Sequence, residues 1–267
     1  MAMGSDDWRD FDQPTLDAAY DNTAAVADSA AWLDTWRRRS AASRAAASAQ
    51  LDIPYGDGPR RAFDLFPAGA GAPVFAFIHG GYWLRNDRSM FGFTADGLQT
   101  LGVTTAVIGY PLTPEARLTE IARDCTAALA AVVRQTRTRR LVVGGWSAGG
   151  HLSALMLENA DVAAAVPISG IFDLAPIASC SMNAVIGLDA AEVAALSPLA
   201  RPAPGKPLAP FAGALELPEL RRQSAAYAAH AGAELRLLDG RDHFSILDDL
   251  HHADGPICRK VAALAGA

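Results

Sequence analysis

The sequence predicts an α/β protein built on a mostly parallel, eight-stranded sheet with helices on both faces and a helical extension at the N-terminus. Three observations support this prediction. From Leu51 onward, short apolar segments alternate with longer helical ones. The first two strand candidates have no helix between them, which indicates an antiparallel start to the sheet. The 267 residues, 51% of them hydrophobic, are also sufficient for one large buried core.

The N-terminal segment is expected to lie outside the sheet. Residues 14–48 are predicted to form two helices that lean over an edge of the strand-rich part. The second helix would place these apolar side chains on one side: Ala31, Trp32, Leu33 and Trp36. We therefore divide the chain into an N-terminal helical extension or partial cap, residues 1–48, and an α/β domain, residues 49–267.

The strand and helix candidates follow one another in a regular order. The strand candidates are residues 51–55, 61–66, 73–79, 103–110, 140–145, 162–169, 207–213 and 234–239. The clearest helical segments are residues 118–135, 148–158 and 217–231. Residues 170–210 interrupt this order with weak periodicity and several prolines, so a long functional loop is expected there.

Charge and cysteine content narrow the classes of partner. A formal net charge of −6 and a pI near 5.5 argue against nucleic acid or an acidic membrane surface. Cys125, Cys180 and Cys258 have no CxxC spacing, so neither a disulfide framework nor a zinc site is indicated. No apolar run approaches the ~18 residues of a membrane span, and the N-terminus lacks the pattern of a signal peptide. We expect a cytoplasmic protein whose partner is a small-molecule substrate, with no nucleic acid and no membrane; the sequence leaves homodimer formation open.

The segment Gly145–Gly149 carries the strongest chemical signal. It reads G-W-S-A-G and lies between an apolar strand candidate and a helix, which is the strand–turn–helix setting of a G-x-S-x-G nucleophile turn. Glycine is needed on both sides of the serine because side chains there would collide with neighbouring backbone. We predict Ser147 as a nucleophile whose hydroxyl stands clear of the sheet.

A serine nucleophile needs a base, and the base needs an acid that orients it. His243 is the predicted base because it lies in a loop directly after the last strand candidate, where sites of parallel sheets assemble. Four other histidines follow the serine and are less suited to this role: His151, His230, His251 and His252. The spacing alone leaves the acid open between Asp173 and Glu216, each of which follows a strand candidate.

Several stretches together resemble one family. They are HGGYW at 79–83, Y-P-L-T-P-E at 110–115, G-W-S-A-G-G-H-L at 145–152 and D-H-F at 242–244. This set is similar to that of the α/β-hydrolases, and within them to the kynurenine formamidase (arylformamidase) branch beside the hormone-sensitive-lipase-like esterases. The resemblance covers about residues 50 to 250. It implies the α/β-hydrolase fold for residues 49–267 and a serine hydrolase activity.

The resemblance also implies which acid belongs to the site. Formamidases carry a segment of the form acid-x-P-E-F-x-R-Q-S at the end of the penultimate strand. Residues 216–224 of this chain read E-L-P-E-L-R-R-Q-S. Glu216 is therefore the implied partner of His243, in preference to Asp173.

The turn after the third strand candidate is implied to stabilise negative charge. Gly80 and Gly81, with the N–H of Tyr82, would join the N–H of Ala148 as oxyanion-hole donors, while His79 would brace the loop. Tyr82 stands where lipase-like relatives often carry a third glycine, which suggests a tight acyl pocket suited to formyl or acetyl. The candidate substrate contacts are Tyr82, Trp83, Trp146, Phe172, Met182 and Phe244.

These interpretations combine into one expected reaction. Ser147, His243 and Glu216 would transfer an acyl group through an acyl-enzyme, with no metal or organic cofactor. The resemblance favours an aryl formamide such as N-formylkynurenine as the substrate. A short-chain carboxylesterase is the close alternative. A non-catalytic ligand-binding relative is the third reading, and the presence of all three triad residues argues against it.

Overall fold

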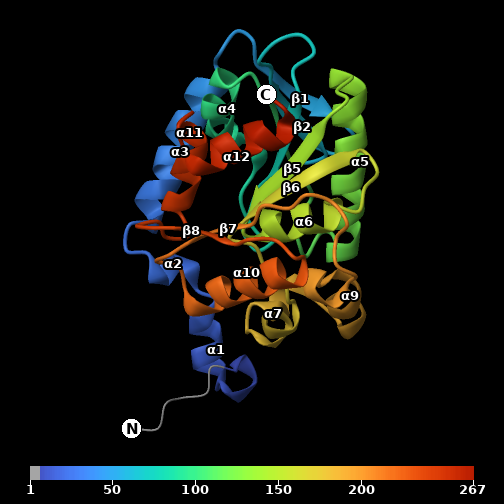
Figure 1. The fold of residues 1–267 in the computed structure, drawn as a ribbon. Coiled ribbons are helices and arrows are strands. Elements are labelled where there is room, and N and C mark those ends of the chain that lie inside the picture. Colours follow the sequence, from blue (N-terminus) through green and yellow to red (C-terminus); the bar gives the residue numbers. More distant parts are fainter. Residues whose placement is uncertain (1–6) are drawn as a thin grey trace.

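The computed structural model describes residues 7–267 and contains an eight-stranded sheet of order β1-β2-β4-β3-β5-β6-β7-β8 (Figure 1). The strands are β1 (Gln50–Pro54), β2 (Ala62–Phe66), β3 (Val74–Ile78), β4 (Thr104–Ile108), β5 (Leu141–Trp146), β6 (Val162–Ile168), β7 (Phe211–Gly213) and β8 (Arg236–Leu238). Strand β2 is antiparallel to β1 and β4, and the remaining pairs are parallel. The predicted mostly parallel sheet with an antiparallel start is confirmed.

The central strands are buried on both faces, which is why their sequences are nearly continuous apolar runs. Alternate residues of β3 enter two separate apolar clusters: Val74, Ala76 and Ile78 belong to one, and Phe75 and Phe77 to the other. The sheet therefore separates two cores, as expected when side chains alternate across a strand. Strands β3 and β5 run parallel in register, so the loops that follow them meet at one edge of the sheet.

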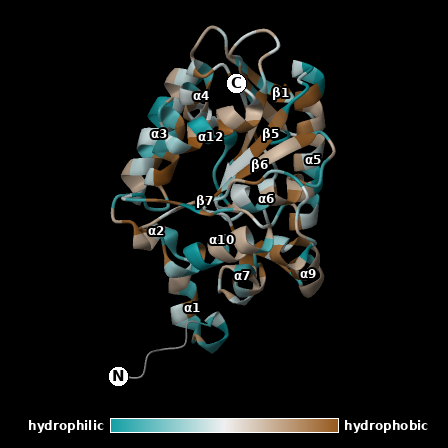
Figure 2. Ribbon diagram, in the orientation of Figure 1, coloured by the Kyte–Doolittle hydropathy of each residue, from teal (hydrophilic) through white to brown (hydrophobic). Residues whose placement is uncertain are grey.

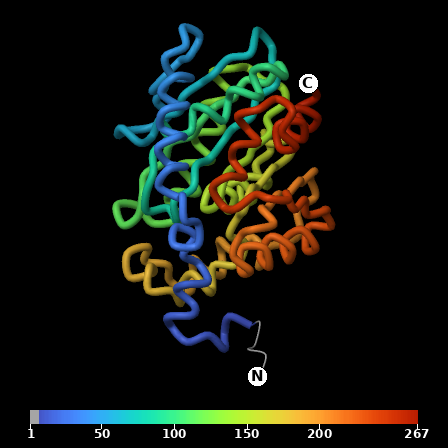
Figure 3. The backbone as a smooth tube through the Cα atoms, turned by 90° about the vertical axis from the view of Figure 1, so that its left-hand side faces the viewer, coloured from blue at the N-terminus to red at the C-terminus, as the bar shows by residue number. Residues whose placement is uncertain are grey.

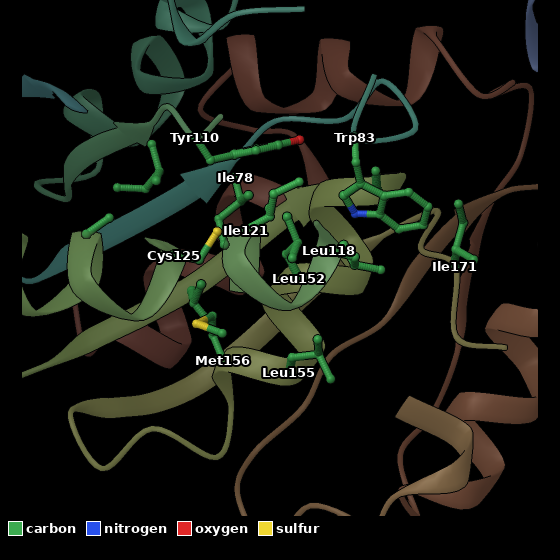
Figure 4. Packing of buried hydrophobic residues seen from close by; sticks show 14 of the residues in the cluster. Ile78, Trp83, Tyr110, Leu118, Ile121, Cys125, Leu152, Leu155, Met156 and Ile171 are labelled. Atoms are coloured by element: carbon green, nitrogen blue, oxygen red, sulfur yellow. The ribbon is translucent and has the colours of Figure 1, made fainter. Parts of the chain in front are cut away.

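Helices cover both faces of the sheet. Figure 1 shows α5 and α6 on one face and α3, α4 and α12 on the other, and Figure 4 shows part of the core beneath α5 and α6. Figure 2 shows hydrophobic residues gathered in the central strands and hydrophilic ones on outer helices such as α3. The bounds are α4 (Asp96–Thr100), α5 (Leu118–Thr136), α6 (Ala148–Met156), α10 (Pro218–His230), α11 (Asp248–His251) and α12 (Pro256–Ala265). Short 3₁₀ turns are η1 (Trp8–Asp10), η2 (Arg88–Met90), η3 (Gly92–Ala95), η4 (Pro198–Ala200) and η5 (Ser245–Leu247).

The N-terminal segment forms three helices rather than the two predicted. They are α1 (Gln13–Ala19), α2 (Asn22–Ala25) and α3 (Ser29–Arg44). The prediction was wrong because Asp12 and Asp21 each accept a hydrogen bond from a backbone N–H three residues ahead and so start separate helices. Figure 3 shows α3 running along the face turned to the viewer. Its Trp36 side chain is fully buried beneath the helix, in the apolar cluster on that side of the sheet.

Residues 170–210 are also more regular than predicted, because they contain α7 (Ala175–Ser179), α8 (Asn183–Ile186) and α9 (Ala190–Leu196). The prediction of a long loop is therefore wrong, because helices of four to seven residues are too short to show a clear hydrophobic period in the sequence. The Asn183 side chain forms hydrogen bonds with the backbone of Ala178 and Leu188, which makes it a structural brace.

Among residues 7–267 there is no helix long and apolar enough to cross a bilayer.

Candidate active site

Ser147 occupies the sharp turn between β5 and α6, with φ 57° and ψ −118°. Its N–H donates to the carbonyl of Ile168 at 2.9 Å. A Cβ on Gly149 would lie 1.9 Å from the Ile78 oxygen, and one on Gly145 would lie 2.3 Å from the Gly149 oxygen. The two glycines therefore permit a close approach of strand and helix that holds Ser147 in a sparsely populated conformation.

His243 and Glu216 form a buried pair, with 3.2 Å between His243 Nδ1 and Glu216 Oε2. The other carboxylate oxygen accepts the N–H of Gly213 at 2.7 Å and the hydroxyl of Ser169. A carboxylate only accepts hydrogen bonds, so it favours the tautomer with the proton on Nδ1. His243 Nε2 is then left as the acceptor, which is the state a general base needs.

Close packing of two loops brings this pair together. A Cβ on Gly213 would lie 2.3 Å from the Arg241 oxygen, so only glycine lets the end of β7 approach the loop that carries His243. Asp173, the alternative acid, lies elsewhere. Its carboxylate accepts the N–H of Ala175 at the start of α7. Of the two acids that spacing left open, Glu216 is the one that contacts the histidine.

The turn after β3 packs directly on the serine turn. A Cβ on Gly80 would lie 2.5 Å from the Trp146 oxygen and 3.0 Å from Ser147 Cβ. Gly81 has φ 118°. Four N–H groups in this region have no hydrogen-bond acceptor within residues 7–267. They are the N–H groups of Gly80, Gly81, Tyr82 and Ala148. Bare donors beside a nucleophile are what a developing oxyanion requires.

His79 is a buried neighbour of this turn rather than a member of the cavity. Its Nδ1 contacts the Gly80 oxygen at 2.9 Å, and its ring stacks on Tyr110 with centroids 4.2 Å apart. The Tyr110 hydroxyl in turn donates to the His79 carbonyl at 2.8 Å. Complete burial lowers the pKa of His79 to about 4, so the ring stays neutral near pH 7. These contacts fit a brace for the loop.

The N-terminal segment is bonded to the same turn. The Tyr82 hydroxyl donates to the Tyr20 carbonyl at 2.6 Å and accepts from Asn22 Nδ2 at 3.1 Å. The Tyr20 hydroxyl donates to Glu219 Oε2 at 2.8 Å. Because Glu219 lies three residues after Glu216, this chain of bonds links the N-terminal helices to both the donor turn and the acid loop.

Ser147 and His243 line one cavity of about 90 Å³. Its remaining lining residues are Asn22, Thr23, Leu33, Gly81, Tyr82, Arg85, Asn86, Trp146 and Phe244. Three of the residues predicted to contact substrate, Tyr82, Trp146 and Phe244, therefore line this cavity. Met182 lies in an adjoining pocket of about 290 Å³. Within the part of the chain that the structure describes, no cluster of three or more potential metal ligands occurs.

Two predicted substrate contacts, Trp83 and Phe172, do not line the cavity. Trp83 has φ 58°, and its fully buried ring packs edge-on against His151 within the core (Figure 4). Phe172 is buried against Tyr227, with ring centroids 4.3 Å apart, because Gln223 holds its N–H and turns the loop toward α10. Both side chains are buried in packing contacts and do not line the cavity that holds Ser147.

The sequence did not point to several residues that lie around the site. Ser169, which donates to Glu216, follows β6 in a positive-φ conformation, and its position after a strand was the one available signal. Tyr20 and Asn22 reach the site from the N-terminal helices, and no motif marks them. Arg85 lies just beyond the HGGYW segment and lines the cavity with its neighbour Asn86.

The chain is similar to known proteins over most of its length. A family model described as alpha/beta hydrolase fold matches residues 75–202. The kynurenine formamidase of Salmo salar is 26% identical over 249 residues, which cover 84% of each chain, and that of Danio rerio is 27% identical over 78% of this chain and 79% of its own. The crystal structure of a candidate thioesterase from Silicibacter shares 30% identity and superposes with a TM-score of 0.88 over 94% of this chain and 99% of its own. A hormone-sensitive lipase from a metagenome library superposes with a TM-score of 0.69 at 21% identity, over 97% of this chain and 98% of its own.

Proposed function

We propose that this chain, which belongs to the α/β-hydrolase family in the branch of kynurenine formamidases and hormone-sensitive-lipase-like esterases, is a small-acyl hydrolase. Its proposed substrate is an aryl formamide such as N-formylkynurenine, from which it removes the acyl group. One observation carries the proposal. The buried His243–Glu216 pair and Ser147 share one small cavity, beside four N–H groups that have no acceptor within residues 7–267. Acyl transfer requires this combination of nucleophile, oriented base and oxyanion donors.

In the proposed mechanism Ser147 Oγ attacks the formyl carbon while His243 Nε2 accepts the hydroxyl proton. Glu216 holds the imidazole and stabilises the imidazolium that forms. The N–H groups of the two turns receive the negative oxygen of the tetrahedral intermediate; loss of one such donor typically costs about 2.7–4 kcal/mol.

His243 then gives its proton to the leaving amine, so the C–N bond breaks and a formyl-enzyme remains. Water adds to that ester with His243 again acting as base. Collapse of the second intermediate releases formate and restores the Ser147 hydroxyl. An aniline-type nitrogen leaves more readily than an alkyl amine, which favours aryl formamides.

The dimensions of the cavity support a small acyl group. Its volume of about 90 Å³ is well below the ~300–1,000 Å³ of sites that enclose drug-sized ligands. Tyr82 lines the cavity, and Asn22, Thr23 and Leu33 line it from the N-terminal segment. These contributions support the proposal that residues 1–48 act as a partial cap. Trp146 and Phe244 add aromatic side chains to the lining, which suits an aryl leaving group.

A short-chain ester or thioester is the second candidate substrate. The same cavity would accept an acetyl group, and the same groups would cleave a C–O or C–S bond. The strong structural similarity to a candidate thioesterase favours including it. Fold similarity alone does not select between the two bonds.

The test is a comparison of kcat/KM for N-formyl-L-kynurenine, p-nitrophenyl acetate and p-nitrophenyl butyrate. We expect the formamide to be preferred, and Ser147→Ala to lose about 10³-fold or more in kcat with folding retained. Ser179→Ala, which removes an exposed hydroxyl outside the cavity, is the matched control. Ester turnover with negligible formamide cleavage would instead support the second candidate, and an active Ser147→Ala would contradict the assigned nucleophile.

A further inference from the structure

A second pocket, of about 290 Å³, adjoins the cavity. The two spaces share four lining residues: Asn22, Thr23, Tyr82 and Arg85. Arg85 thus lines both the cavity that holds Ser147 and the outer pocket. A leaving group that extends from Ser147 toward the outer pocket would pass these shared residues.

Arg85 carries an unpaired charge at the shared wall. Its guanidinium is exposed and has no hydrogen-bond or ion-pair partner among residues 7–267. Nearby arginines differ, because Arg60 contacts Asp87 at 3.6 Å and Arg88 contacts Asp64 at 3.4 Å. A free guanidinium presents a planar fork of N–H donors that matches a carboxylate.

The backbone that carries Arg85 is tightly held. The Arg85 N–H donates to the Gly81 carbonyl at 3.1 Å, and a Cβ on Gly81 would lie 2.4 Å from the Arg85 oxygen. The next residue, Asn86, donates from Nδ2 to the Gly80 carbonyl at 3.1 Å. Arg85 therefore belongs to the same compact turn as the oxyanion donors, which fixes where its side chain begins relative to the scissile bond.

Two aspartates, Asp17 and Asp21, also line the outer pocket. Asp17 is already occupied, since it accepts the N–H and the hydroxyl of Ser181 at 2.7 and 2.6 Å. Asp21 accepts the Ala24 N–H with one oxygen, and its other oxygen has no partner in the described part of the chain. A ligand in this pocket thus meets one unpaired cation and one unpaired carboxylate oxygen, which complement the carboxylate and ammonium of an amino acid.

We propose that Arg85 is a specificity-determining residue, whose guanidinium binds the carboxylate of a leaving group that carries an amino-acid side chain. Asp21 faces the ammonium group of the same side chain. This inference rests on the proposed function, which supplies the reaction at Ser147. It adds to that function a contact that separates formamides with an amino-acid group from those without one.

The experiment compares two formamides that differ in the amino-acid group alone. N-formyl-L-kynurenine carries the amino-acid side chain, and 2-formamidoacetophenone has a methyl ketone in its place. The variants are Arg85→Gln and Arg85→Lys, with Arg123→Gln as the matched control. Arg123 is also exposed and without an ion-pair partner among residues 7–267, but it lies on α5 away from the cavity.

We expect Arg85→Gln to lower kcat/KM for N-formyl-L-kynurenine about tenfold more than for the neutral formamide, mainly through KM. Arg85→Lys should retain part of the preference because it keeps the charge without the fork. The inhibition constant of the product L-kynurenine should rise by a similar factor in Arg85→Gln. Arg123→Gln should leave the ratio between the two substrates unchanged.

Two results would overturn the inference. Equal losses for both formamides would show that Arg85 merely supports the turn, and no loss for either would show that it makes no contact with substrate. Both results leave the proposed function intact. A wild-type protein that cleaves neither formamide would refute the proposed function itself, so the two failures are distinguishable.

Discussion

Replacing Glu216 with glutamine tests how the acid controls the histidine. The change keeps the shape and turns one acceptor oxygen into an NH₂ donor. One carboxylate oxygen accepts both the Gly213 N–H at 2.7 Å and the Ser169 hydroxyl, while the other faces His243 Nδ1 at 3.2 Å. An NH₂ placed against the Gly213 N–H would leave buried donors unpaired, at a cost of about 1–3 kcal/mol. The amide should therefore keep its oxygen toward Gly213 and its NH₂ toward His243.

That orientation inverts the histidine tautomer. An NH₂ group that donates to Nδ1 moves the imidazole proton to Nε2, which can then no longer accept the proton of Ser147. In a serine protease with a comparable triad, the equivalent carboxylate-to-amide change lowers kcat by about 10⁴. We expect a loss of about 10³ to 10⁴ in kcat for Glu216→Gln, equivalent to about 4–5.5 kcal/mol in the activation barrier, with little change in KM.

The assay is the measurement of kcat and KM for N-formyl-L-kynurenine, together with urea unfolding to confirm that the variant is folded. Ser169→Ala is the matched control because it removes one donor to Glu216 without changing the tautomer; we expect it to lose less than about tenfold. A folded Glu216→Gln that stays within about tenfold of wild-type kcat would refute the reasoning. So would a Ser169→Ala variant as impaired as Glu216→Gln.

The remaining predictions concern packing and pH. Gly149→Ala would place a Cβ 1.9 Å from the Ile78 oxygen, so activity should be lost and the free energy of unfolding should fall by about 1–3 kcal/mol; unchanged stability in urea would contradict this. Burial lowers the pKa of His79 and His151 from 6.5 to about 4. Between those pH values the unfolded state binds protons that the native state does not, so stability should fall as pH drops below about 6.5, by up to about 1.4 kcal/mol per pH unit for each histidine. Equal free energies of unfolding at pH 7 and pH 5 would contradict that linkage.

Local patterns were sufficient for the main architecture. The strands and the Ser147 turn depend on apolar runs and on glycines within a few residues of one another, so the sequence predicts them well. The predicted strand ends were less accurate. Strand β7 begins at Phe211 rather than at residue 207, because Pro207 and Pro210 have no N–H to donate to the hydrogen bonds of the sheet. The division of the N-terminal segment was also marked locally, by the Asp12 and Asp21 caps, and the apolar pattern alone did not reveal it.

By itself, the sequence determined the eight-stranded fold, the glycine-flanked serine turn and the loop that carries the histidine. Tertiary structure decided which groups meet. It placed Glu216 rather than Asp173 against His243, a choice that residue spacing left open and only the family resemblance implied. It also turned Trp83 away from the cavity and brought Tyr20 from the N-terminal helices onto Tyr82. These outcomes depend on contacts between segments far apart in the chain and on the direction in which a side chain leaves a positive-φ backbone. Neither is encoded in the spacing of residues along a single segment.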